Sequence, residues 1–184
     1  MTRIEIVESD PTWPEQFVTL RTRLASALGD EALRIDHIGS TSVPGLAAKD
    51  VIDIQITVAA LDPAILDQLE TAGFTARRDI TDDVLVGCDD RVQLTKLYAR
   101  EGEGERRANI HIRAAGRRNQ RYALLFRDYL RADPTVRDAY AQLKRHLAVQ
   151  HPDDVDAYYD VKDPVMDIIY RGAEVWAAAH RWSQ

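Results

Sequence analysis

The stretch Arg34–Val58, RIDHIGSTSVPGLAAKDVIDIQITV, decides the fold of this chain. Apolar and polar residues alternate in two segments, 32–39, which begins two residues before this stretch, and 50–58, which ends it. This spacing predicts a β-strand in each segment. The segment between them, 40–49, contains Ser, Pro and Gly and predicts a loop or a short helical turn. Polar residues between two strands form either a site for phosphate and metal or an ordinary turn, and the other segments are needed to distinguish the two.

The segment 50–58 has two chemically different faces, because side chains of a strand point alternately to opposite sides of the sheet. The apolar face consists of Ile52, Ile54, Ile56 and Val58, and the other face of Val51, Asp53, Gln55 and Thr57. We therefore expect Asp53 to lie outside the apolar core, on a rigid element.

The remaining segments predict an α+β fold, a mixed β-sheet flanked by helices with a helical C-terminal third. Further strands are predicted over 3–7, 74–80, 82–89, 91–99 and 108–114, and helices over 11–29, 62–73, 119–133, 134–151 and 152–182. Pro164 has to kink the last helix or start a new one, because proline lacks an amide hydrogen. No linker rich in Pro, Gly or Ser interrupts the sequence, so residues 1–184 are expected to form a single domain.

Composition excludes several classes of protein. The net charge of −6 argues against a general nucleic-acid binder, which usually carries a basic excess. The single cysteine, Cys88, excludes an intramolecular disulfide and a cysteine-based zinc cluster, and it favours a reducing compartment. The charged start MTRIEIVESD is not typical of a signal peptide, and no apolar run approaches the length of a membrane span. We expect a cytoplasmic protein without a membrane or nucleic-acid partner.

The polar residues of the opening stretch suit phosphate chemistry when they are taken together. Gly39 permits a backbone that aims amide groups at a phosphate, and Ser40 adds a hydroxyl donor. Asp53 can hold a magnesium ion, and Lys49 can neutralise phosphate charge. Each has a simpler explanation, since Gly-Ser is often a turn, Asp53 can be a hydrogen-bonded sheet residue and Lys49 a solvated one. Their combination favours a ligand site.

Gly-Ser, a spacer and then Asp on a strand resembles the signature of the nucleotidyltransferase fold. Longer strings between Ser9 and Lys162 resemble one family of that superfamily, the GrpB family. These strings are SDPTWP, HIGSTSVPGLAAK followed by DVIDI, NIHI, LLFRDYLRADP, AYAQLK and AYYDVK. The resemblance implies a small mixed sheet with flanking helices. It also implies that Gly39, Ser40 and the adjacent Thr41 lie by the phosphates of a nucleoside triphosphate, and that Asp53 is the catalytic acid that binds Mg²⁺.

The sequence departs from the superfamily pattern in its acids. Gln55 replaces the second acid, although it is still expected at the substrate, and a glutamine oxygen is a weaker ligand for a hard cation. The strand that carries a third acid in the superfamily offers Asn109, His111 and Arg113 instead, where related chains more often read His-x-His. A site with two metal ions normally uses several carboxylates. We therefore expect at most a single Mg²⁺ that arrives with the nucleotide.

Two histidines and three cations complete the candidate residues. His111 is a candidate to orient a nucleophile, act as general base or bind a metal, and equally a candidate for a buried sheet histidine. His37 is expected to brace the turn that follows it. Arg127, Lys144 and Lys162 are expected around a bound polyphosphate or acidic substrate, although cations are common on helix surfaces.

Three hypotheses follow. In the first, the protein is an enzyme that binds a nucleoside triphosphate with magnesium and transfers a nucleotidyl group to an unknown small-molecule acceptor, or activates a small acid. In the second, it is a non-catalytic module that binds a nucleotide or small anion on the same fold, which Gln55 and the missing third acid favour. The third, a purely structural interaction domain, is the least favoured because it leaves the polar cluster unexplained.

Overall fold

The computed structural model describes residues 3–184 and contains one mixed, five-stranded sheet. Its strand order is β1-β2-β5-β4-β3, where the strands are β1 Arg34–Ile38, β2 Ile52–Val58, β3 Thr75–Ala76, β4 Leu97–Arg100 and β5 Ala108–Ala114. The β2–β5 pair is parallel and the other pairs are antiparallel. The two strands predicted at the ends of the opening stretch are therefore neighbours, joined by the 3-10 turn η2, Ser40–Ser42.

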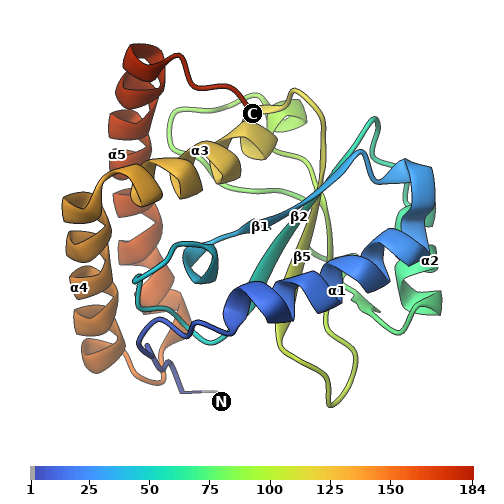
Figure 1. The fold of residues 1–184 in the computed structure, drawn as a ribbon, viewed down its shortest axis with the longest axis horizontal. Helices are drawn as coiled ribbons and strands as arrows, with labels where there is room; N and C mark the ends of the chain where they lie inside the picture. Colours follow the sequence, from blue (N-terminus) through green and yellow to red (C-terminus); the bar gives the residue numbers. More distant parts are fainter. Residues whose placement is uncertain (1–2) are drawn as a thin grey trace.

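Five α-helices flank the sheet, which confirms the predicted α+β class and the helical C-terminal third. They are α1 Trp13–Leu28, α2 Ala64–Thr71, α3 Arg118–Ala132, α4 Pro134–Gln150 and α5 Val155–His180. In Figure 1, α4 and α5 run side by side at the left with α3 next to them, whereas α1 and α2 lie in front and at the right. Within residues 3–184, the helices are all too short or too polar to cross a membrane.

The apolar face of β2 forms the main core, as its alternation predicts. Ile52, Ile54 and Ile56 are completely buried and pack with residues of β5, α1 and α2, among them Leu24 and Leu69. Fully burying one such side chain contributes about 1.5–3 kcal/mol. This core fixes the orientation of β2, so that its other face, which carries the polar residues, is turned away from α1 and α2.

A second apolar cluster holds the loop that follows β1. Val43 and Leu46 of this loop are buried together with Leu125 of α3, Tyr140 of α4 and Ala173 of α5. The loop is therefore sandwiched between the sheet and the helical third, and the polar face of β2 is brought close to residues of α3, α4 and α5.

Two strand predictions are wrong. Segment 3–7 is not a strand, because Val7 makes only an isolated bridge to Ala48. Segment 82–89 is an irregular loop whose one bridge residue is Asp82. Of the two alternatives given for Pro164, the start of a new helix is wrong, because the last helix is a single element that passes through this residue. The predicted strands at 74–80 and 91–99 shorten to β3 and β4, since Arg91–Gln93 forms a 3-10 turn and Thr95 makes only an isolated bridge, to Asp82.

Candidate functional site

Asp53 is the acid at the centre of the candidate site. It pairs across the sheet with Asn109 of β5, whose amide nitrogen donates a hydrogen bond to Asp53 Oδ1 at 2.7 Å. The Tyr98 hydroxyl of β4 donates to Asn109 Oδ1 at 2.6 Å and fixes the orientation of that amide. Burial raises the pKa of Asp53, against the opposing effects of the Asn109 hydrogen bond and the positive charge of Lys162. The carboxylate is thus held in one direction on a rigid strand.

Gly39 lies directly against this carboxylate. Its φ is +66°, a left-handed conformation that favours glycine. A Cβ atom at Gly39 would lie 2.2 Å from Asp53 Oδ2, far inside contact distance. Residue 39 therefore has to be glycine both for its backbone and for the space that Asp53 occupies.

Thr41 and His37 hold the turn in place instead of facing a ligand. Thr41 Oγ1 donates to the Val51 carbonyl at 3.2 Å, so its only hydrogen is used. His37 Nε2, 3.0 Å from Thr41 Oγ1, must then be the donor of that pair. Burial and the charges of Arg131 and Arg127 lower the His37 pKa to about 4, which keeps the ring neutral. The bracing role expected for His37 is confirmed, and the buried Thr41 belongs to the same brace.

Lys144 reaches the turn from α4. Its ammonium group donates to Ser40 Oγ at 2.8 Å and to the Ala47 carbonyl. The side chain is buried, and burial together with the charge of Lys162 lowers the Lys144 pKa to about 7. Because Ser40 Oγ accepts from Lys144, its own hydrogen remains available for a ligand.

Lys49 and Lys162 meet at an aromatic pair on α5. The Lys49 ammonium lies 4.3 Å and 4.5 Å from the ring centroids of Tyr158 and Tyr159 and donates to the Tyr159 hydroxyl at 3.3 Å. The Lys162 ammonium lies 4.9 Å from the Tyr159 ring and donates to Asp163 at 2.6 Å. Cations over aromatic faces are stabilised without a paired carboxylate. Lys49 is therefore held in place while its charge remains available.

We call Lys49, Lys144 and Lys162 the lysine cluster, because their charges act on one another. Burial lowers the pKa of Lys49 to about 8, and repulsion from Lys162 and Arg107 adds to this effect. Asp53 opposes the shift for both Lys49 and Lys144. Two carboxylates, Asp53 and the Asp163 paired with Lys162, thus face the three lysines and Arg107, and this excess of positive charge favours binding of an anion.

Gln55 does not face the lysine cluster, although it follows Asp53 on the same face of β2. Its Oε1 accepts from Arg113 Nη1 at 2.8 Å, and its Nε2 donates to the Gln120 carbonyl at 3.1 Å. Arg113 in turn forms an ion pair with Asp83, with Nε 2.8 Å from the carboxylate. Gln55 is completely buried and both ends of its amide are used inside the protein, so its contact with substrate stays a prediction to which these bonds lend no support.

His111 belongs to the same buried group as Gln55. Its Nδ1 lies 3.4 Å from both Lys96 Nζ and Arg113 Nη2, and its ring lies edge-on to Tyr98 at 5.1 Å. Burial and the two neighbouring cations lower its pKa well below the usual value. These contacts are those of a neutral histidine fixed within the sheet, which favours that alternative over a catalytic role.

Arg127 is also placed apart from the lysine cluster. Its guanidinium donates to the His37 carbonyl at 3.1 Å and to Asp128 at 2.7 Å, and lies 3.6 Å from Asp36. These bonds join α3 to the edge strand β1. These contacts give Arg127 a structural role, and its place at a polyphosphate stays a prediction.

Sequence reasoning missed several residues of the site. Asn109 was noted only as the position of a missing acid, yet it orients Asp53 directly. Tyr98 comes from a segment without a motif, and Tyr159 lies in the string AYYDVK but was not singled out; strand pairing and the packing of α5 bring them to the site. The two-residue period of β5 is the one signal that places Asn109 on the face of Asp53.

Comparisons with known proteins agree with this architecture. The profile of the family described as "GrpB protein" matches residues 3–171. The chain is 40% identical to a "Dephospho-CoA kinase" of Mycolicibacterium paratuberculosis over 97% of its own length and 48% of that protein. It is 35% identical to "UPF0157 protein BH1888" of Halalkalibacterium halodurans, with 92% of this chain and 82% of the relative covered.

A solved structure shows the same fold. The crystal structure of the conserved protein GrpB from Enterococcus faecalis is 31% identical and superimposes with a TM-score of 0.76, covering 94% of this chain and 99% of that one. The chain spans about half the length of the dephospho-CoA kinases that it matches. The family profile extends over most of the chain, from the segment before α1 into α5. On this ground, together with the shared fold, the chain belongs to the GrpB family.

Proposed function

We propose that this protein binds a nucleoside triphosphate with magnesium and transfers its nucleotidyl group to a small acceptor, activating an acid. The observation that carries the proposal is the lysine cluster around Asp53, next to the turn of Gly39 and Ser40. Three ammonium groups come from three separate elements, the loop before β2, α4 and α5. The name of the kinase relatives refers to proteins twice as long, and we transfer no kinase activity from it.

The charge of the cluster suits a triphosphate. Lysine ammonium groups act as point cations for phosphate oxygens. In the absence of a ligand, the Lys49 and Lys144 pKa values are lowered to about 8 and 7. An anion between the lysines removes part of their repulsion and favours their charged forms. Ser40 can add a hydroxyl donor, because Lys144 already donates to its oxygen.

The residues present fit one magnesium ion that shares the oxygens of a phosphate. No group of three or more His, Cys, Asp or Glu side chains suitable for an ion occurs within residues 3–184. Asp53 would supply the single protein carboxylate, and phosphate oxygens and water the remaining ligands, as is usual for Mg²⁺. When bound, the ion would neutralise phosphate charge. A pair of ions held by several carboxylates does not fit this site.

In the proposed reaction, an acceptor oxygen attacks the α-phosphorus of the nucleotide. The new O–P bond forms as the bond from the α-phosphorus to the bridging oxygen breaks, and pyrophosphate leaves with that electron pair. The lysine cluster stabilises the charge that develops on the leaving group. A carboxylate acceptor is already ionised at neutral pH, so its attack requires no general base. The reaction therefore proceeds without His111, which the contacts assign to the buried group.

A second candidate function is binding of a nucleotide or small anion without chemistry. The observation that favours it is that both ends of the Gln55 amide are hydrogen-bonded inside the protein. Asp53 is therefore left without a neighbouring side chain that could also bind the ion. The lysine cluster serves binding equally well in both candidates. They differ only in whether pyrophosphate is released.

The two candidates are separated by measuring binding and turnover on the same protein. Each nucleoside triphosphate is incubated with Mg²⁺ and with a panel of small carboxylic acids, and thermal shift and pyrophosphate release are recorded. A shift with release supports transfer, and a shift without release supports the binding module. Absence of any shift overturns both. Lys49→Met should lose the shift, whereas Arg78→Gln, on a surface ion pair with Glu70, is the control that should keep it.

A further inference from the structure

We propose that the cavity at the β3–β4 edge of the sheet binds the acceptor, and that Arg100 and Arg107 hold an anionic group of this acceptor. The group is a carboxylate or a phosphate. The inference rests on the proposed function, because it assigns the second substrate of the same site. It also adds two cations that no motif of the sequence indicates.

Strand register places Arg100 in line with the candidate acid. Asp53 of β2 is paired with Asn109 of β5, Asn109 with Arg100 of β4, and Arg100 with Thr75 of β3. Directly paired residues project to the same face of a sheet. Arg100 therefore lies on the face of Asp53, two strand spacings or ~10 Å away.

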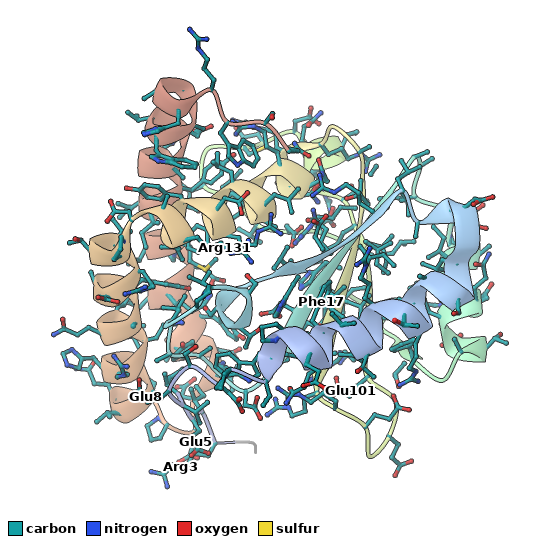
Figure 2. All side chains as sticks on the ribbon, viewed as in Figure 1. Arg3, Glu5, Glu8, Phe17, Glu101 and Arg131 are labelled. Carbon is teal, nitrogen blue, oxygen red and sulfur yellow. The ribbon has the colours of Figure 1, made fainter. Side chains whose placement is uncertain are left out.

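A cavity opens at this end of the row. It has a volume of about 490 Å³ and is lined by Thr75, Arg77, Arg100 and Arg107 and by the loop between β4 and β5. Figure 2 labels Glu101 in this loop, at the lower end of the sheet as viewed there. A cavity of this size accommodates a small metabolite.

Two of the three guanidinium groups at the cavity have no hydrogen-bonded carboxylate within residues 3–184. Arg100 Nε is buried without a hydrogen-bond partner, and the nearest carboxylate, Glu101, is 3.7 Å from it. Arg107 forms no ion pair with any described residue. Arg77, in contrast, is bound by Asp79 at 3.0 Å and 2.8 Å. An unsatisfied buried donor is unfavourable, and a ligand oxygen that reached it would supply the missing acceptor.

Two of the three carboxylates at the cavity have other partners inside the protein, although Glu101 also lies 3.7 Å from Arg100. Glu101 accepts from the Ala108 amide at 3.0 Å, and Glu105 forms an ion pair with Arg23 at 2.6 Å. These two acids are thus engaged with the loop and with α1, whereas Glu103, which also lines the cavity, forms no ion pair with a described residue. Two guanidinium groups against this one carboxylate leave an excess of positive charge, which favours an anion as the ligand.

The arginines of the cavity lie close enough to the lysine cluster for their charges to interact with it. Arg107 contributes to the lowered pKa of Lys49. Both Arg100 and Arg107 act on Tyr159, which contacts Lys49. An acceptor anchored on the two arginines therefore extends toward Asp53, so its attacking oxygen and its anchored anion are separate groups. Succinate and glycerol 3-phosphate are small probes of this class.

The test uses NMR of the full chain, following the Arg100 Nε–H signal. Succinate and glycerol 3-phosphate are titrated separately, with the lysine cluster occupied by a non-hydrolysable ATP analogue and Mg²⁺. We expect one of them to shift this signal, and the responding probe distinguishes carboxylate from phosphate. Its affinity, measured by titration calorimetry because Arg100→Gln lacks the Arg100 signal, should fall at least fivefold in Arg100→Gln and in Arg107→Gln. Arg77→Gln, at the same cavity but with a guanidinium already paired, should keep it.

Nucleotide affinity is measured in the same variants by titration calorimetry. Unchanged affinity in Arg100→Gln agrees with a separate acceptor subsite. Loss of nucleotide affinity in this variant, or equal loss of probe binding in Arg77→Gln, would overturn the proposal. So would the absence of a response to both probes. If the nucleotide does not bind, the probes are titrated into the free protein that carries Lys49→Met, which still tests the two arginines. Failure of the proposed function is thereby distinguished from failure of the acceptor subsite.

Discussion

Gly39 and Asp53 occupy adjoining positions such that a side chain on the first displaces the carboxylate of the second. The Cβ of an alanine at position 39 would lie 2.2 Å from Asp53 Oδ2 and 2.7 Å from Asp53 Cβ. The two halves of the opening stretch are thus joined by direct contact between a turn and a strand. This contact links the phosphate-binding turn of the proposal to its metal-binding acid.

Gly39→Ala should therefore abolish Mg²⁺-dependent nucleotide binding and also lower stability. Gly29→Ala is the matched control, since Gly29 also has a positive φ, +50°, but open space around its Cβ position. The control should show only the backbone cost, about 1–3 kcal/mol. Binding by calorimetry and denaturant unfolding of both variants check this. Equal stability loss in the two variants, with nucleotide binding kept in Gly39→Ala, would contradict the contact.

Ser40→Ala should weaken triphosphate binding without abolishing it. The variant loses one hydrogen bond to a charged group, about 1.5–3 kcal/mol or roughly tenfold and more in Kd. It also leaves Lys144 without its 2.8 Å partner, although the bond to the Ala47 carbonyl remains. Calorimetry with melting temperatures alongside is the measurement. An unaltered Kd at matched folding means that Ser40 does not contact phosphate.

The pKa values of Lys144 and Lys49, about 7 and 8, predict the pH dependence of anion binding. Tripolyphosphate binds their charged forms, so affinity should fall as pH rises from 7 to 9, where phosphate itself is already ionised. The free energy of unfolding of the free protein changes in the opposite direction and increases with pH. The unfolded chain keeps the Lys144 proton up to about pH 10.5, so this residue makes stability rise between pH 7 and 10.5.

Lys144→Arg keeps its charge throughout this range and is the control for that prediction. Its affinity for tripolyphosphate should depend on pH less steeply than that of the wild type. A parallel pH profile in the two proteins would show that Lys144 does not titrate in the binding range.

Gln55→Glu should not tighten magnesium binding, although it restores the second acid of the superfamily pattern. The new carboxylate keeps Arg113 as partner but loses the donor to the Gln120 carbonyl and faces that oxygen instead. We expect a loss of stability of about 1–3 kcal/mol and unchanged Mg²⁺ affinity. Titration calorimetry that shows a tighter ion would place residue 55 at the metal after all.

Asp53→Asn should remove Mg²⁺-dependent nucleotide binding while the fold remains intact. An asparagine oxygen can still accept the hydrogen bond from Asn109, and burial already raises the pKa of Asp53, so removing its charge does not destabilise the protein. The melting temperature should stay the same or increase. A large fall in melting temperature with binding retained would identify Asp53 as structural.

Much of the fold follows from local patterns. The alternation in 50–58 correctly assigned Ile52, Ile54 and Ile56 to the core and Asp53 to the opposite face. The helices were recognised because their apolar residues recur with helical spacing over several turns. Segment 82–89 was predicted as a strand from its apolar run, yet it forms a loop in which Asp83 is ion-paired with Arg113 and Lys96. Such an ion pair between distant residues has no local signal.

The sequence by itself determined the class of fold, the family and the central pair of Gly39 and Asp53, because these depend on neighbours along the chain or on a short specific string. Tertiary structure decided which polar residues share a site. It turned Gln55 and Arg127 toward partners inside the protein and brought Lys49 and Lys144 together with Lys162. It also aligned Arg100 with Asp53 across two intervening strand pairings. The physical reason is that strand register and helix packing join residues far apart in sequence, and only these contacts determine which charges remain unpaired.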